Sequence, residues 1–201
     1  TLPPAELRRR TVSLHPGQSI TMEQVESALL ACGYERAVQV DGSGQFSRRG
    51  GILDVFTPDA EQPARLEFWG DEIDTISLFD VETQRRTDSV EELILAPAVE
   101  ALADDPAALA EKIRRLASSL RGKTAPKAKE ILTAQADKLA QGLHLGCLDK
   151  FITLLYDKTA TLFDYAGDDT LFFLSESTKC RERMRSTLWQ WGEDVKEYLE
   201  E

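Results

Sequence analysis

The hydrophobic pattern of the sequence changes near Pro97, from one typical of strands to one typical of helices, so the two halves of the chain should differ in structure. Before Pro97, short segments alternate between apolar and polar residues and are separated by glycine-containing turns, which is the pattern of paired β-strands. After Pro97, long stretches rich in Ala, Leu and Lys carry apolar residues at helical spacing. A chain of 201 residues is long enough to form two small cores. We therefore predict two domains, residues 1–97 and 98–201.

A short amphipathic helix is predicted in the first half, from Met22 to Cys32. Thr21 and Gln24 have the spacing of a capping box, and Gly33 supplies the left-handed residue that ends many helices. The apolar residues recur at helical spacing and form one stripe: Met22, Val25, Leu29 and Cys32. This stripe is expected to face a sheet.

The remainder of the first half is expected to be that sheet. The predicted strands are residues 36–40, 45–49, 52–56, 64–69, 72–79 and 90–95. Residues 41–44 are predicted to form the turn between the first two strands, and Gly70-Asp71 suits a type II′ hairpin turn. The predicted fold class is α/β in the α+β sense: an antiparallel sheet with one packed helix, followed by a mostly helical partial α/β domain.

The second half is expected to contain helices from Pro106 to Gly122, over 125–141, over 147–157, and a long final helix. Residues 170–174 are apolar throughout, which is typical of a strand buried on both faces of a parallel sheet. Such a strand needs neighbours, and residues 162–165 are the nearest candidate. This half therefore looks like part of a larger α/β domain.

Charge and cysteine usage narrow the class of protein. The formal net charge is -11, from 35 acidic and 24 basic residues, which argues against a strong duplex-DNA-binding surface and favours a protein partner. The chain has no apolar run of the roughly 18 residues that would span a membrane, and no signal peptide. Three cysteines far apart suggest a reduced, cytoplasmic protein, with Cys32 and Cys180 buried on helices.

Two apparent nucleotide or catalytic patterns lack the context that they need. Gly122-Lys123-Thr124 resembles the end of a P-loop, but Ala117 stands where the loop requires glycine. His15 and His144 have no serine or cysteine in a recognisable local motif. We expect no catalytic residue and no bound cofactor, so the chain should neither hydrolyse ATP nor unwind DNA.

An acidic group at Asp71, Glu72 and Asp74 leaves one alternative open, a metal-dependent nuclease domain. Those carboxylates fall in and beside the predicted hairpin turn at Gly70, where solvated acids are common, whereas magnesium-binding carboxylates of helicases end a buried strand next to a P-loop. We therefore expect no metal site.

Three arginines stand out in a half where acidic residues outnumber basic ones by 17 to 9. Arg36, Arg48 and Arg49 lie on two predicted strands that a short turn could bring together. Composition alone is compatible with an ordinary solvated face. The functional interpretation is a patch of guanidinium groups that binds the carboxylates of a partner protein, which arginine pairs in bidentate geometry.

Four stretches of this half resemble, in order, the UvrB homology module of the transcription-repair coupling factor family (Mfd). They are GYER at 33–36, GQFSRRGGILDVF at 44–56, FWGDEID at 68–74 and FDVETQRR at 79–86. The excinuclease UvrB carries a looser version, and the wording GGILD and DVETQ is closer to the coupling factor.

The resemblance implies a UvrA-binding domain followed by the latter half of a split domain that is shaped like a helicase core without nucleotide motifs. It implies a docking module that recruits UvrA to stalled RNA polymerase for nucleotide excision repair. RNA polymerase and DNA would be contacted by other domains of the parent, an ATP-driven translocase. A UvrB-type excinuclease fragment is the alternative, but it would need a P-loop and a DNA-inserting hairpin, and neither is found in this sequence.

The resemblance also implies which residues meet UvrA. Arg36 matches a tyrosine-x-arginine position, and Arg49 matches the arginine before the glycine. A further arginine of UvrB falls where this chain has Ser47; Arg48 is adjacent, but a step of one residue along a strand reverses the face, so Arg48 is a doubtful substitute. Phe46 or Trp69 is expected to add apolar contact.

Overall fold

The computed structural model of the chain describes residues 1–122, 125–143 and 145–200, the side chains of 195–200 excepted. It has two compact units. The first is Thr1–Asp105 together with Gly146–Asp164, and the second is Pro106–Leu145 together with Tyr165–Glu201. The sequence pattern gave no sign that a segment from the second half would join the first unit.

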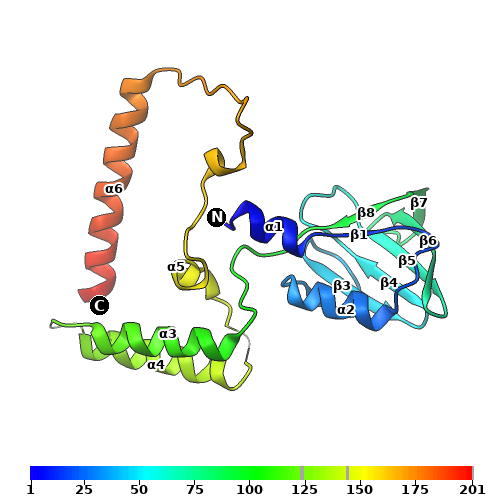
Figure 1. Cartoon of the computed structure of the whole chain (residues 1–201), viewed down its shortest axis with the longest axis horizontal. Helices are drawn as coiled ribbons and strands as arrows, with labels where there is room; N and C mark the ends of the chain where they lie inside the picture. Colours follow the sequence, from blue (N-terminus) through cyan, green and yellow to red (C-terminus); the bar gives the residue numbers. More distant parts are fainter. Residues whose placement is uncertain (123–124, 144, 201) are drawn as a thin grey trace. The chain divides into compact units, whose positions relative to one another are not determined.

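The first unit contains a sheet, a helix packed on it and several short elements (Figure 1). Its elements are α1 (Pro4–Arg10), β1 (Val12–Leu14), α2 (Met22–Ala31), β2 (Glu35–Arg36), β3 (Gln45–Arg49), β4 (Ile52–Val55), β5 (Ala64–Trp69), β6 (Glu72–Phe79), β7 (Arg86–Ser89), β8 (Leu93–Leu95), η1 (Leu148–Phe151), α5 (Ile152–Leu155) and η2 (Leu162–Tyr165). The sheet has the strand order β2-β3-β4-β5-β6-β7, and β1 pairs with β8 in a separate two-stranded sheet. The pairs from β3 to β7 are antiparallel, so the predicted fold class is confirmed.

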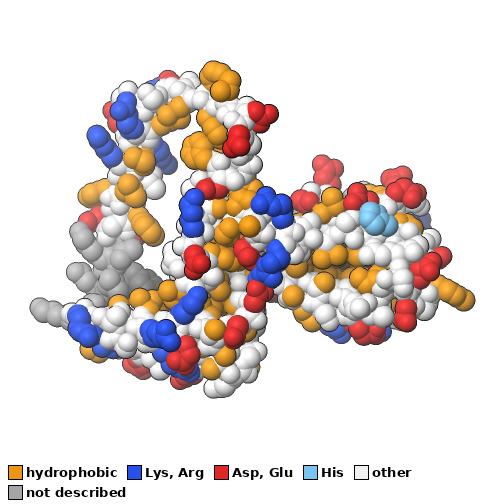
Figure 2. All heavy atoms as spheres, viewed as in Figure 1, with side chains coloured by type: hydrophobic (Ala, Val, Ile, Leu, Met, Phe, Trp, Pro, Cys, Tyr) orange, Lys and Arg blue, Asp and Glu red, His pale blue; other side chains and the backbone are white. Residues whose placement is uncertain are grey.

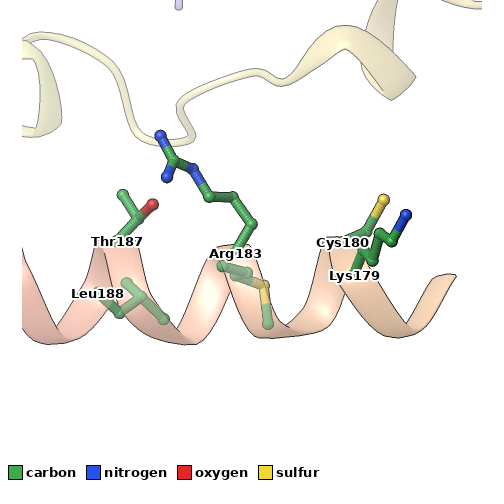
Figure 3. A pocket seen from close by; sticks show the side chains of 6 residues that line it. Lys179, Cys180, Arg183, Thr187 and Leu188 are labelled. Atoms are coloured by element: carbon green, nitrogen blue, oxygen red, sulfur yellow. The ribbon is translucent and has the colours of Figure 1, made fainter. Parts of the chain in front are cut away.

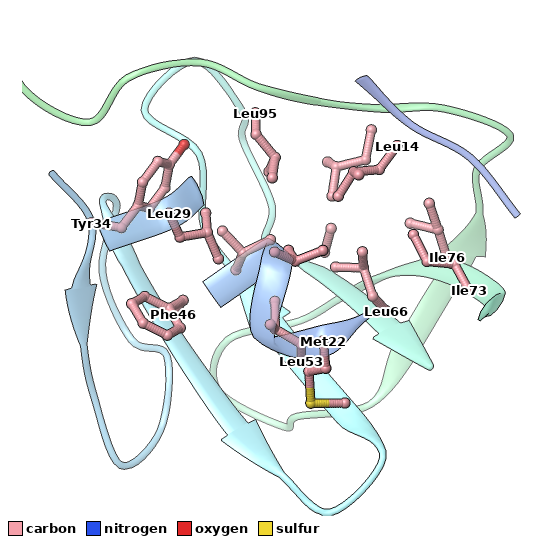
Figure 4. Close-up of a cluster of buried hydrophobic side chains, with 14 of the residues drawn as sticks. Leu14, Met22, Leu29, Tyr34, Phe46, Leu53, Leu66, Ile73, Ile76 and Leu95 are labelled. Atoms are coloured by element: carbon pink, nitrogen blue, oxygen red, sulfur yellow. The ribbon is translucent and has the colours of Figure 1, made fainter. Parts of the chain in front are cut away.

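Helix α2 forms where its capping signals stand. The Thr21 hydroxyl accepts a hydrogen bond from the Gln24 backbone N–H, the Gln24 side chain accepts one from the Thr21 N–H, and Gly33 has a φ of 81°. The helix lays its apolar stripe on one face of the sheet, and Figure 4 shows the resulting core. That core joins α2, the sheet and the β1–β8 pair through Leu14, Met22, Val25, Leu29, Phe46, Leu53, Val55, Leu66, Ile73, Ile76 and Leu95.

Two strand predictions need correction, and one strand was missed. Of the predicted strand 36–40, only Arg36 lies in a strand, β2 (Glu35–Arg36), and β2 pairs in parallel with β3 instead of forming a hairpin. The following segment leaves the sheet because Val40 turns into a fully buried position while Val38 is exposed. The last predicted strand shortens to Leu93–Leu95, and β7 forms although its four residues are polar and exposed. Polar edge strands give no alternation signal, so β7 was not predicted.

A charged network ties α1 to the end of the first unit. The buried Arg10 donates through Nη2 to Asp104 Oδ1 at 2.7 Å and through Nη1 to the Ala31 carbonyl at 3.2 Å. Arg9 donates to the other oxygen of Asp104 at 2.6 Å and also pairs with Glu6. Burial opposes ionisation of Asp104, yet the two guanidinium groups hold its pKa below the ordinary value of 3.8.

This network should make the first unit sensitive to acid. Because the pKa of Asp104 is lowered in the folded chain, the carboxylate stabilises the fold above about pH 4 and this contribution is lost as the pH falls through the lowered value. The melting temperature of the wild type should therefore fall further between about pH 6 and pH 3 than that of Asp104→Asn. Equal falls in both proteins would show that the network does not contribute.

Residues 146–164, the later segment of the first unit, are held by a tyrosine. Tyr156 follows α5, its hydroxyl donates to the Glu100 carbonyl at 2.9 Å, and it accepts a hydrogen bond from the Leu102 N–H at 3.3 Å. Burial raises the pKa of this phenol. Tyr156 thus bonds residues 146–164 to the segment around Glu100 and Leu102, which precedes the second unit in the chain.

The second unit is helical. Helices α3 (Pro106–Ser119) and α4 (Ala125–Ala140) form a hairpin that buries Leu109 and Ile113, and α6 (Ser177–Glu200) is the long final helix; these helices confirm the predictions (Figure 1). The part of α3 that the sequence extended to Gly122 ends slightly earlier, at Ser119.

The predicted buried strand at 170–174 does not form. These residues are irregular and exposed, with Phe173 91% exposed, and Leu162–Tyr165 is a short 3₁₀-helix instead of a neighbouring strand. A strand buried on both faces requires partner strands, which the described residues of this unit do not provide. The apolar side of α6 is exposed as well, at Met184, Leu188 and Trp191, and Cys180, predicted to be buried, is exposed.

Candidate functional site

The five residues predicted to contact a partner all lie on the sheet of the first unit. Arg36 is on the edge strand β2, three are on β3 and Trp69 ends β5. Successive residues of a strand point to opposite faces, so Phe46 and Arg48 share the face covered by α2, whereas Arg49 points to the other face. We call these the helix face and the outer face of the sheet.

On the helix face, two arginines share one buried carboxylate. Glu26 of α2 accepts from Arg36 Nη2 at 2.6 Å and from Arg48 Nη1 at 2.8 Å, and Arg48 also pairs with Glu23 at 2.8 Å. The guanidinium of Arg36 lies over the ring of Phe46, 5.6 Å from its centroid. Two guanidinium groups thus meet two carboxylates, and the cluster fastens α2 to β2 and β3.

This arrangement changes the grouping of the arginines within the predicted site. Arg36 and Arg48 belong together, whereas Arg36 and Arg49 lie on different faces. The expectation that Arg48 and Arg49 point in opposite directions is confirmed. Phe46 is 0% exposed and belongs to the core, so a partner cannot reach it, and we assign it to the fold instead of to a docking surface.

On the outer face, Arg49 shares the buried carboxylate of Asp54 with Arg65, a residue that no sequence motif singled out. Asp54 of β4 is 1% exposed; Arg49 Nη2 donates to its Oδ2 at 2.9 Å, and Arg65 of β5 donates through Nε at 2.7 Å and Nη2 at 2.9 Å. The guanidinium of Arg65 lies 4.6 Å from the ring centroid of Phe79, and its hydrogen bonds to Asp54 raise its pKa. Two guanidinium groups meet one carboxylate here, so this cluster is positively charged.

Trp69 lies at the same end of the sheet as Arg49. The Phe68 N–H donates to the Gly51 carbonyl at 2.8 Å, which joins the β5–β6 hairpin to the β3–β4 turn that follows Arg49. Phe68 packs against the core, so its neighbour Trp69 projects on the opposite side and is 84% exposed. The outer face therefore presents an arginine and a large aromatic side chain at one end.

A second ion pair on the outer face was also missed. Glu67 of β5 pairs with Arg86 of β7. These outer-face partners could have been found only from the strand register, which sets Asp54 opposite Arg65 and Phe79 opposite Arg86. Register over several strands depends on long-range pairing, and turn residues alone did not specify it.

The histidines and the P-loop-like residues form no recognisable catalytic arrangement in the described part of the chain. Ser13 Oγ lies 3.0 Å from His15 Nε2, but the hydroxyl donates to Glu92 at 2.6 Å, so the histidine does not act as its base. Gly122 follows the end of α3, and Ala117 is buried in that helix. Lys123, Thr124 and His144, which belonged to the rejected motifs, lie outside the described residues.

Acidic side chains are spread over the unit that contains the sheet, as Figure 2 shows for one face. Asp71, Glu72 and Asp74 are exposed around the β5–β6 hairpin. Within residues 1–122, 125–143 and 145–200, no three His, Cys, Asp or Glu side chains are grouped so as to hold a metal ion. In the same residues, no helix has both the length and the apolar character needed to cross a membrane.

A shallow hollow runs along α6 (Figure 3). Lys179, Cys180, Arg183 and Thr187 project from one side of the helix. All of its lining residues belong to this one helix and all are exposed. A hollow on a single exposed helix does not bury a ligand, so it is not a binding site in this structure.

The sheet-containing unit matches a known family. A family model described as the UvrB interaction domain matches residues 12–100, the range that holds both arginine clusters and Trp69. The full chain is also similar to transcription-repair-coupling factors: 34% identical to that of Bacillus subtilis over 100% of this chain and 18% of the relative. The factor of Myxococcus xanthus is 31% identical over 94% of this chain, and that of Mycobacterium tuberculosis is 34% identical over 86%. The chain spans less than a fifth of the length of these relatives.

Proposed function

We propose that residues 12–100, which match the UvrB interaction domain family, dock the repair protein UvrA through the outer face of the sheet. The observation that carries this proposal is that Arg49 and Trp69 are both exposed at the same end of that face. Arg49 is half-exposed in a positively charged cluster, and Trp69 is almost fully exposed. Arginine and tryptophan are the residues most enriched among the energetic centres of protein interfaces.

The contribution of each side chain follows from its position. Arg49 would form charge-assisted hydrogen bonds with a carboxylate of UvrA, and the ring of Trp69 would be buried against an apolar part of the same surface. Arg36 stands on the edge strand with its side chain 57% exposed, so it would contact UvrA at the margin. Arg48 is directed to α2 and would make no contact.

The role within a larger protein is part of the same proposal. The similarity to transcription-repair-coupling factors supports a module that delivers UvrA to stalled RNA polymerase in the bacterial cytoplasm. Contacts with RNA polymerase and DNA, and ATP-driven translocation, would belong to parts of the protein outside this chain. The chain itself would act by docking, without catalysis and without a cofactor.

Titration of UvrA against wild type and single alanine variants tests the docking surface. Arg49→Ala and Trp69→Ala should each weaken binding by about 2–4 kcal/mol, or roughly 30-fold to 1,000-fold, because each removes a central contact. Arg36→Ala should cost about 1 kcal/mol, as expected for a contact at the rim of an interface. Thermal melts of all variants should lie close to the wild type, because these side chains are at least half-exposed.

Arg48→Ala is the matched control, since it removes the neighbouring guanidinium on the opposite face. It should bind UvrA like the wild type. Wild-type affinity in Arg49→Ala and Trp69→Ala, or a loss in Arg48→Ala equal to that in Arg49→Ala, would refute the outer face as the docking surface.

A further inference from the structure

The buried carboxylate of Asp54 links two strands of the sheet, and it also orients the side chain of Arg49. Both oxygens of Asp54 are bonded: Oδ1 accepts from Arg65 Nε, while Oδ2 accepts from Arg65 Nη2 and from Arg49 Nη2. Arg65 is itself held in place, because it lies over Phe79 and donates to the Gln84 carbonyl at 3.4 Å. Asp54 is therefore a fixed anchor for one nitrogen of the half-exposed Arg49.

Anchoring one nitrogen leaves the remainder of the guanidinium in a defined orientation. Arginine carries five N–H donors in a rigid planar fork. Asp54 is bound through Nη2, and half of the Arg49 side chain is accessible to solvent. The fork that remains accessible has the geometry that pairs with a carboxylate through two parallel hydrogen bonds.

Charge balance distinguishes Arg49 from the other arginines of the sheet. Arg36 and Arg48 are matched by Glu23 and Glu26, and the guanidinium of Arg86 is matched by Glu67 (these clusters are neutral). Arg49 and Arg65 share only Asp54 among the described residues, which leaves one positive charge at the exposed member. The complementary group on a partner is therefore a carboxylate.

We infer that Asp54, held by Arg65, is a positioning residue that fixes the Arg49 guanidinium as a pre-formed receptor for a carboxylate of the docking partner. This inference rests on the proposed function. A side chain that is already ordered loses less entropy when the partner binds, so the anchor should raise affinity without touching the partner. Without this anchor, Arg49 would be a mobile surface charge, and an ion pair that it formed with the partner would contribute little binding free energy.

A double-mutant cycle with UvrA separates positioning from general support of the fold. Asp54→Asn should weaken binding by about tenfold in the wild-type background, because the loss of one ordered side chain corresponds to roughly that factor. In an Arg49→Ala background the same substitution should change affinity by less than about twofold, since no guanidinium remains to be positioned. Equal losses in both backgrounds would show that Asp54 supports only the fold, and no loss in either would refute positioning.

Arg49→Lys provides a second variant that keeps the positive charge. Its position is half-exposed, so folding should be unaffected, and this variant carries the test if Asp54→Asn unfolds. The ammonium of lysine is a point charge that cannot bond Asp54 and present a planar fork together. We expect it to bind UvrA about tenfold more weakly than the wild type. Wild-type affinity would overturn the inference.

A measurement without UvrA separates this inference from the proposed function. In the free chain, the Arg49 guanidinium should give resolved nitrogen-bound proton signals in NMR spectra, because its hydrogen bond to Asp54 restricts rotation. Arg49 signals averaged by rotation in the wild type would overturn the inference whatever UvrA does. Resolved signals that are lost in Asp54→Asn, combined with a wild type that does not bind UvrA, would refute the docking partner and leave the pre-formed carboxylate receptor standing.

Discussion

Phe46→Ala should lower the free energy of unfolding by about 3–5 kcal/mol, because removing a fully buried ring leaves a cavity in the core. The ring lies beneath the Arg36 guanidinium, so that residue should also lose its ordered position. Denaturant unfolding of the full chain would measure the loss. Val38→Ala, at a position that is 95% exposed, is the control and should change stability by less than about 0.5 kcal/mol.

The same variant tests whether Phe46 is part of the docking surface. Under conditions in which Phe46→Ala is still folded, the affinity for UvrA should fall no more than Arg36→Ala lowers it. A variant with wild-type stability and a strong loss of binding would place the ring at the interface instead of in the core.

Arg65→Ala should be the most destabilising arginine substitution on the outer face, at about 3–5 kcal/mol, because it removes two of the three guanidinium hydrogen bonds of the buried Asp54 carboxylate. Arg49→Ala removes the third bond from a half-exposed side chain and should cost less than about 1 kcal/mol. Thermal and denaturant unfolding of the two variants would measure the difference.

An apolar replacement of the pair provides a control for this interpretation. Asp54→Leu combined with Arg65→Met removes both charges and keeps the positions filled, so it should recover most of the stability lost in Arg65→Ala. If Arg65→Ala is as mild as Arg49→Ala, the carboxylate is less dependent on Arg65 than the hydrogen bonds indicate.

The parts of the fold that the sequence predicted well are those specified by neighbouring residues. Thr21, Gln24 and Gly33 define both ends of α2 within a dozen or so positions, and Gly70 marks the β5–β6 hairpin. Such signals act locally, so a single sequence reveals them. The antiparallel order from β3 to β6 follows from turns of this kind.

The composition of the candidate site depended on pairing between distant residues. Alternation along β3 correctly separated Arg48 from Arg49, because it requires only one strand. The face of Arg36 is set by the parallel register of β2 against β3 and by Glu26 of α2, and neither is specified by local sequence. Asp54 was missed for the same reason, since its importance arises from the strand that carries Arg65.

The wrong prediction at residues 170–174 has a related cause. An apolar run indicates that a segment is suited to burial, but it does not indicate what covers the segment. Phe173 and its neighbours are exposed in this chain because the described residues offer no strand beside them. The proposed docking site does not depend on this segment, because the first unit forms its own core.

The two hydrogen bonds of the Tyr156 hydroxyl, to the Glu100 carbonyl and from the Leu102 N–H, give the α3–α4 hairpin the topology of an insertion. The chain leaves the first unit after Asp105 and re-enters it at Gly146, so the hairpin has both of its ends anchored in one host domain. Insertions of this kind can change length or sequence at their tip without altering the path of the host. The hairpin can therefore change without altering the first unit, whereas residues 146–164, although they come later in the sequence, are part of the compact unit that carries the proposed docking surface.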